Sequence, residues 1–196
     1  MMYQFIDIHT HHPRHDVISP RMAGVHPWDA ERGYELPNFE ECDIVGEIGL
    51  DYCCKADRNM QRELFERQLQ IASTIDKPVV IHNVRATEDI LKILTRYPQL
   101  RGVLFHGFIG SQQQAESIVK RGYYLSFGDR SLRSPKSRDV IATTDIRRLF
   151  CETDDDPNLA IEEIYAEVAK IRNMTTEELL NAIETNYKTF FRNIDY

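Results

Sequence analysis

The chain has 196 residues, of which 42% are hydrophobic and 28% are charged, and its formal net charge is −7. This composition excludes a disordered or low-complexity chain, and the acidic balance argues against a protein that coats nucleic acid non-specifically. The length predicts a single domain over residues 1–196. No apolar run approaches the roughly 18 residues of a membrane span, and the N-terminus lacks a signal-peptide pattern. A cytoplasmic protein without a membrane partner is therefore expected.

Short apolar runs typical of buried parallel strands recur along the chain. They cover residues 3–8, 22–25, 43–50, 78–81, 102–105, 123–127 and 148–151. Helical patterns occupy most of the intervals between and after them. They cover residues 58–75 and 88–97, a helix beginning at Ser111, residues 158–171, and a helix beginning at Thr175. The helix starts at Ser111 and Thr175 carry capping boxes, with Gln114 and Glu178 three residues on.

The alternation of strands and helices predicts an α/β fold with a parallel sheet. Seven strand–helix units in one domain favour a TIM-type (β/α) barrel. The usual barrel has eight strands and about 250 residues. A small, incomplete or distorted barrel of about seven strands is therefore expected.

Side chains that bind metals stand at or near the ends of these runs. They are His9, His11, His26, Glu47, His82, His106 and Asp154. Because the carboxyl ends of barrel strands meet at one face, these residues are expected to converge. His12 and His15 end no apolar run, so they are predicted to be ordinary histidines without a ligand role.

His9 and His11 are two residues apart, which on a strand places both imidazoles on the same face. Imidazole and carboxylate ligands without thiolate suit Zn, Mn, Fe or Ni better than Mg or Ca. The remaining candidates can complete two sites. Two metal ions about 3.5–4 Å apart would clamp a phosphoester for in-line attack by a shared hydroxide. Trp28 either walls this pocket or packs in the core.

The cysteines form no metal or disulfide motif. They are Cys42, Cys53, Cys54 and Cys151, and no C-x-x-C pair exists. Reduced thiols in a reducing compartment are expected.

At these residues the sequence resembles the TatD family of metal-dependent hydrolases, which includes deoxyribonucleases. The matching segments are residues 6–11, 24–27, 46–52, 78–82, 102–108 and 152–154. Gln61, Phe65, Gln68 and Leu69 match the family's helix after the Glu strand, and Asn186, Tyr187, Phe190 and Phe191 match its C-terminal end. The combination of E-I-G-L-D-Y with H-x-H and E-T-D is highly specific, and the resemblance covers nearly the whole chain in order.

The resemblance implies a metallo-hydrolase barrel with two divalent metal ions, whose identity (Zn, Mn, Mg, Ni or Fe) stays open. One metal would be held by His9, His11, Glu47 and Asp154. The other would be held by Glu47, His82 and His106, with Glu47 as the bridge. Glu47 and Asp154 are thereby the expected catalytic residues, and Asp154 would orient or deprotonate the attacking water.

Three features depart from the family pattern. Only 14 residues separate His11 from His26, so one βα unit is absent, and distortion or a partner chain must close the gap. Arg85 stands three residues after His82, one later than usual. The family's basic loop after Asp154 is missing. His26 and Arg85 are nevertheless expected to bind substrate.

A basic segment offers a substitute for that loop. Residues 128–138 carry four positive charges and one negative charge, and they follow a predicted strand at the active-site face. Arg130 or Arg133 is predicted to contact a substrate phosphate, because arginine binds phosphate in a bidentate manner. The alternative is an ordinary solvated loop.

These observations predict a phosphodiesterase acting on DNA ends. One alternative is a small-molecule hydrolase on the same barrel that cleaves a phosphomonoester, an amide or a lactone. A second alternative is a non-catalytic relative stabilised by metal. The missing βα unit would expose apolar surface, so a homo-oligomer stays open.

Overall fold

The computed structural model describes residues 4–191, and the chain forms two compact parts. The central part is Arg21–Phe105. The terminal part combines the segment that ends at Pro20 with the chain from His106 onward. The prediction of one domain over residues 1–196 stays a prediction.

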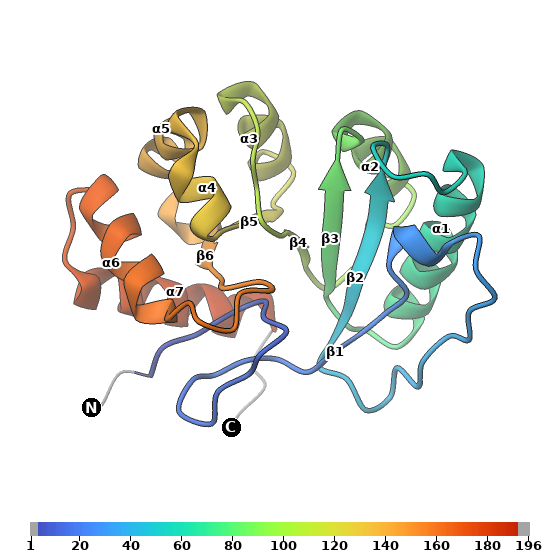
Figure 1. Ribbon diagram of the computed structural model, residues 1–196, viewed down its shortest axis with the longest axis horizontal. Helices are drawn as coiled ribbons and strands as arrows, with labels where there is room; N and C mark the ends of the chain where they lie inside the picture. Colours follow the sequence, from blue (N-terminus) through green and yellow to red (C-terminus); the bar gives the residue numbers. More distant parts are fainter. Residues whose placement is uncertain (1–3, 192–196) are drawn as a thin grey trace. The chain divides into compact units, whose positions relative to one another are not determined.

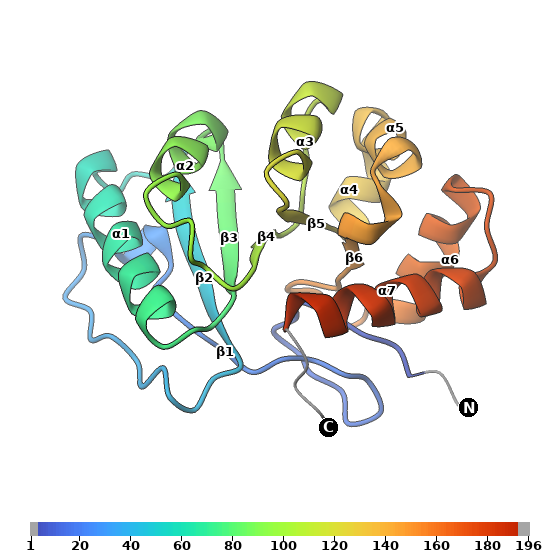
Figure 2. The ribbon, with the colours of Figure 1, turned by 180° about the vertical axis from the view of Figure 1, so that it is seen from behind.

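The central part is built on four parallel strands that lie side by side in chain order. They are β1 (Met22–Ala23), β2 (Ile44–Asp51), β3 (Val79–Val84) and β4 (Val103–Phe105). The helices are α1 (Arg58–Thr74), α2 (Thr87–Leu94) and the short 3₁₀ helix η1 (Pro27–Asp29). In Figures 1 and 2, α1 and α2 cover the same face of β2 and β3. This arrangement buries the predicted apolar runs, and Ile44, Ile48 and Leu50 of β2 are fully buried.

The terminal part contributes two more parallel strands, β5 (Tyr124–Phe127) and β6 (Leu149–Cys151). Its helices are α3 (Gln112–Val119), α4 (Asp129–Arg133), α5 (Pro135–Thr143), η2 (Ile146–Arg148), α6 (Ile161–Ile171) and α7 (Thr176–Phe190). The rings of Tyr124, Phe150 and Phe190 pack together, with centroids 5.1–5.8 Å apart. Asn186 of α7 donates hydrogen bonds of 2.8 Å to the carbonyls of Ile146 and Leu149. The C-terminal helix is thereby attached to the start of β6.

The α/β class with parallel strands is confirmed, and both predicted capping boxes are present. Two helix boundaries differ from prediction. The helix predicted over 88–97 ends at Leu94, because Pro98 disfavours helical backbone at Tyr97. The helix predicted over 158–171 begins only at Ile161.

The prediction of a strand over residues 3–8 is wrong for its described part, and residue 3 lies outside the described residues. Residues 4–8 form only an isolated bridge, Ile6 with Ile18. The Ile8 amide also donates to the Cys151 carbonyl at 3.2 Å. The segment is therefore extended beside β6 but lacks a continuous ladder. This leaves six strands over residues 4–191 instead of about seven.

The prediction of a loop over residues 128–138 is also wrong. The segment folds into α4 and the first half of α5. Ser134 separates them and accepts a hydrogen bond from the Ser137 amide, while Pro135 opens α5. Proline at the first helical position loses no hydrogen bond, so this Ser-Pro pair is a helix start. Over residues 4–191, no helix combines the length and the apolar character needed to span a bilayer.

Candidate metal centre

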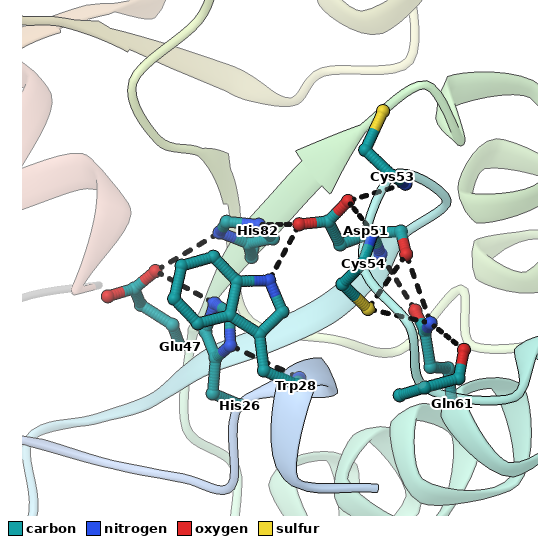
Figure 3. A network of polar contacts seen from close by, with 9 residues as sticks. His26, Trp28, Glu47, Asp51, Cys53, Cys54, Gln61 and His82 are labelled. Carbon is teal, nitrogen blue, oxygen red and sulfur yellow. Dashed lines mark hydrogen bonds and ion pairs between the residues drawn. The ribbon is translucent and has the colours of Figure 1, made fainter.

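Two imidazoles face one carboxylate oxygen in the central part. His82 Nδ1 lies 3.4 Å from Glu47 Oε2, and His26 Nε2 lies 3.8 Å from the same oxygen. Each of the three residues offers a ligand atom within 4.8 Å of the others. Figure 3 shows the side chains converging from β2, β3 and the turn before η1. Such a set of nitrogen and oxygen donors suits a divalent transition metal.

The backbone explains why these side chains meet. Glu47 lies where the register between β2 and β3 is irregular, between Val45 and Ile48. Such irregularities re-aim side chains beside functional sites. Gly49 pairs with His82 at a φ of 148°, and a Cβ at Gly49 would lie 2.0 Å from the His82 carbonyl oxygen. Only glycine allows this close approach of β2 to β3.

The other ring nitrogen of His82, Nε2, lies beside a second carboxylate. Asp51 Oδ2 lies 3.5 Å from His82 Nε2 and accepts a 2.6 Å hydrogen bond from Trp28 Nε1. Asp51 Oδ1 accepts hydrogen bonds from the amides of Cys53 and Cys54 at 2.8 and 3.1 Å (Figure 3). Burial acts to raise the pKa of Asp51, but these donors and His82 outweigh it, so the pKa lies below its usual value. The ionised Asp51 orients His82 so that Nδ1 points toward Glu47.

In the terminal part, Asp154 stands between two histidines. Its Oδ1 lies 3.3 Å from His9 Nε2 and 3.8 Å from His11 Nε2. The His9 side chain is 1% exposed, whereas that of His11 is 52% exposed. Asp154 adopts a φ of 58° and bridges to Thr10, so its backbone is held in the left-handed region. Backbone strain of this kind clusters at functional sites.

Glu152 is a candidate ligand outside the set predicted from the sequence. Its Oε1 is buried, lies 3.6 Å from His106 Nδ1, and accepts no hydrogen bond from any residue in 4–191. Its Oε2 accepts a 2.5 Å hydrogen bond from Ser126 Oγ. His106, Glu152 and Asp154 offer ligand atoms within 4.8 Å of one another. The signal was present in E-T-D, because residues two apart in extended backbone share a face.

Asp7 supports this segment from within the core. It accepts hydrogen bonds from the Thr153 amide at 3.1 Å and the Thr153 hydroxyl at 2.6 Å. Burial raises the pKa of Asp7 to about 7, although these hydrogen bonds act in the opposite direction. Thr153 lies between Glu152 and Asp154, so Asp7 holds both carboxylates in place.

The arginines predicted to bind substrate lie at the surface. Arg85 is exposed directly after β3 and has a φ of 51°. Arg133 forms an ion pair with Asp129 of the same helix at 2.8 Å, and Arg130 lies 3.8 Å from Asp155. Their role in phosphate binding stays a prediction.

The structure groups the predicted ligands as follows. His9 and His11 lie beside Asp154, and Glu47 lies beside His82. His106 groups with Glu152 and Asp154, and its predicted sharing of a metal with Glu47 and His82 stays a prediction. His26, predicted to bind substrate, also stands at ligand distance. All four cysteines are free thiols and none belongs to these clusters, so imidazole and carboxylate form the donor set. Together with the buried Glu152 Oε1, this chemistry fits divalent transition metals. Bridging by Glu47 stays a prediction.

Comparisons with known proteins agree on one family. The family described as "TatD related DNase" matches residues 6–192. The uncharacterized metal-dependent hydrolase YabD of Bacillus subtilis is 31% identical, over 81% of this chain and 68% of YabD. The uncharacterized metal-dependent hydrolase YjjV of Escherichia coli is 33% identical, over 75% of this chain and 62% of YjjV. The crystal structure of YjjV, titled as a TatD homolog, superposes with a TM-score of 0.79 at 25% identity, covering 98% of this chain and 100% of that one.

Proposed function

Because this chain belongs to the TatD-related DNase family of metal-dependent hydrolases, we propose that it cleaves phosphodiester bonds at DNA ends with two divalent metal ions. The observation that carries the proposal is the Asp154 carboxylate, whose Oδ1 lies 3.3 Å from His9 Nε2 and 3.8 Å from His11 Nε2. A carboxylate beside two imidazoles serves both as a metal ligand and as an acceptor for a proton from water.

His9, His11 and Asp154 would hold one ion, and His26, Glu47 and His82 would hold the other. Glu47 as a ligand shared by both ions stays a prediction. When bound, the ions supply Lewis acidity, which polarises a phosphoryl oxygen and makes water more acidic. The donor set favours Zn, Mn, Fe or Ni over Mg.

The chain's own residues supply the proton transfer and the orientation. Asp154 accepts the proton of the attacking water, and its left-handed backbone aims the carboxylate. Asp51 keeps His82 in one orientation through the contact at Nε2. Ser126 does the same for Glu152 by donating to Oε2. The site is thus organised before the substrate binds.

The test is cleavage of end-labelled single-stranded DNA by metal-stripped protein to which Mg, Mn or Zn is returned separately. We expect a shortening ladder that requires metal and is lost in Asp154→Asn. Asp139→Asn is the matched control, because Asp139 is exposed and belongs to none of the ligand clusters. Absence of cleavage with every metal, or undiminished cleavage by Asp154→Asn, would overturn the proposal.

One observation favours a second candidate, a small phosphoester as substrate. Arg133 is engaged by Asp129 and Arg130 faces Asp155, so carboxylates compete with a DNA backbone for both guanidinium groups. A net charge of −7 further disfavours a long polyanion. Metal-dependent hydrolysis of p-nitrophenyl phosphate with no DNA ladder would establish this candidate instead.

A further inference from the structure

Trp28 is an exposed aromatic residue beside the candidate metal ligands. The residue is 56% exposed, which places it with Met60 and Ile109 as the exposed large hydrophobic residues of the described chain. The Trp28 ring centroid lies 4.5 Å from that of His26 and 6.0 Å from that of His82. Solvent therefore reaches an indole that stands next to two candidate ligands.

The indole is held in one orientation even though it is exposed. Its Nε1 donates a 2.6 Å hydrogen bond to the buried carboxylate of Asp51. Its backbone amide donates to His26 Nδ1 at 3.3 Å, which caps η1. The ring also meets the His26 ring edge-on, at an interplanar angle of 78°. Because the indole is already fixed, a ligand that stacks on it loses less conformational entropy of the protein on binding.

We propose that Trp28 is a stacking platform for a nucleobase that flanks the scissile phosphodiester. The proposal rests on the proposed function and refines its substrate class to unpaired nucleotides at a DNA end. Only an unpaired base can leave its own stack and place its face on the indole. Stacking is tolerant of sequence, because every base has a π-face.

The charge distribution supports this class of substrate. Two of the three arginines that are predicted to bind substrate, Arg130 and Arg133, already face carboxylates. The net charge of −7 leaves little general attraction for a polyanion. Stacking provides binding free energy that needs no positive charge, and it selects nucleotides over phosphoesters without a ring. A role in packing alone would leave the indole buried, which it is not.

The first test measures binding without turnover. Trp28 is the sole tryptophan of the chain, so the intrinsic fluorescence reports on this ring alone. The Zn-loaded protein is titrated with a short phosphorothioate oligothymidylate, which resists cleavage, and, separately, with an abasic phosphorothioate oligomer of the same length and charge. We expect saturable quenching by the oligothymidylate and none by the abasic oligomer. Equal quenching by both oligomers, or none by either, would overturn the proposal.

The second test separates stacking from the hydrogen bond to Asp51. Trp28→Leu removes both the aromatic ring and the N–H, whereas Trp28→Phe removes the N–H but keeps a smaller aromatic ring. With metal present, we expect Trp28→Leu to raise the KM for the oligothymidylate by about 10-fold or more, with Trp28→Phe in between. The KM for the abasic oligomer should be the same in Trp28→Leu and Trp28→Phe, because both variants lack the N–H and the abasic oligomer has no base to stack on a ring. Met60→Ala, which removes another exposed hydrophobic side chain, is the matched control and should change neither KM.

The outcomes distinguish this inference from the proposed function. An equal loss on both oligomers in Trp28→Leu would mean that Trp28 acts only through Asp51, and the platform would be overturned even if DNA is cleaved. Quenching specific to the oligothymidylate, in a protein that cleaves no DNA, would support the platform and reject the nuclease activity.

Discussion

The side-chain amide of Gln68, on α1, satisfies both backbone groups of Val25, the residue before His26. The Val25 N–H donates to Gln68 Oε1 at 2.7 Å, and Gln68 Nε2 donates to the Val25 carbonyl at 2.9 Å. Gln68 and Val25 are both buried. A helix thereby sets the position of a loop that carries a candidate ligand.

Gln68→Leu should therefore lower both stability and metal affinity. It leaves a buried donor and a buried acceptor unsatisfied, for which we expect a loss of about 2–4 kcal/mol in the free energy of unfolding. Urea denaturation measures this loss, and metal titration of the folded variant measures the displacement of His26. Gln70→Leu, at an exposed position of the same helix, is the control. Wild-type stability in Gln68→Leu would contradict the structural role of this contact.

Removal of His9 and His11 should empty one metal site. We expect the double variant His9→Ala/His11→Ala to retain about one metal ion fewer per chain than the wild type, and to show a smaller drop in melting temperature on chelation. Elemental analysis and thermal melts with and without EDTA measure these effects. His12→Ala/His15→Ala is the matched control, because both residues are exposed and belong to no ligand cluster. Equal metal content in the two double variants would refute the assignment.

Asp43 should contribute to stability in a pH-dependent way. Burial acts to raise its pKa, but hydrogen bonds from the Arg21 guanidinium and amide outweigh it, so the pKa lies below the usual 3.8. The unfolded chain thus takes up the proton first as the pH falls, and the contribution of ionised Asp43 is present above about pH 4 and lost below it. The melting temperature of Asp43→Asn should fall below that of the wild type at pH 7, and the difference should shrink toward pH 3.

Thermal melts across this pH range test the prediction for Asp43. Asp29→Asn is the control, because the ion pair of Asp29 with Arg32 is exposed and such pairs contribute little. If the difference in melting temperature between Asp43→Asn and the wild type stays constant with pH, the ion pair of Asp43 makes no pH-dependent contribution to stability.

Local sequence patterns predicted much of the fold. Continuous apolar runs located β2 to β6, because strands buried on both faces need apolar residues at every position. Ser111 and Thr175 located two helix starts through their capping boxes. The same patterns failed for residues 4–8, where Ile6 and Ile8 are buried in an extended segment without a ladder. They also failed for α4, which has only five residues, and for α5, which begins at Pro135.

The sequence alone established the α/β class, the resemblance to the TatD family and the residue types that end the strands. Tertiary structure decided which of those residues face one another. Glu152 lies beside His106, and Asp51 lies beside both Trp28 and His82. These residues are far apart in the sequence, so no local sequence pattern predicts their contacts. The physical reason is that periodicity and capping depend on neighbours within a few residues, whereas a metal site depends on strand register and close backbone approach. Gly49, which lets β2 approach β3 at His82, is the residue where that difference is most evident.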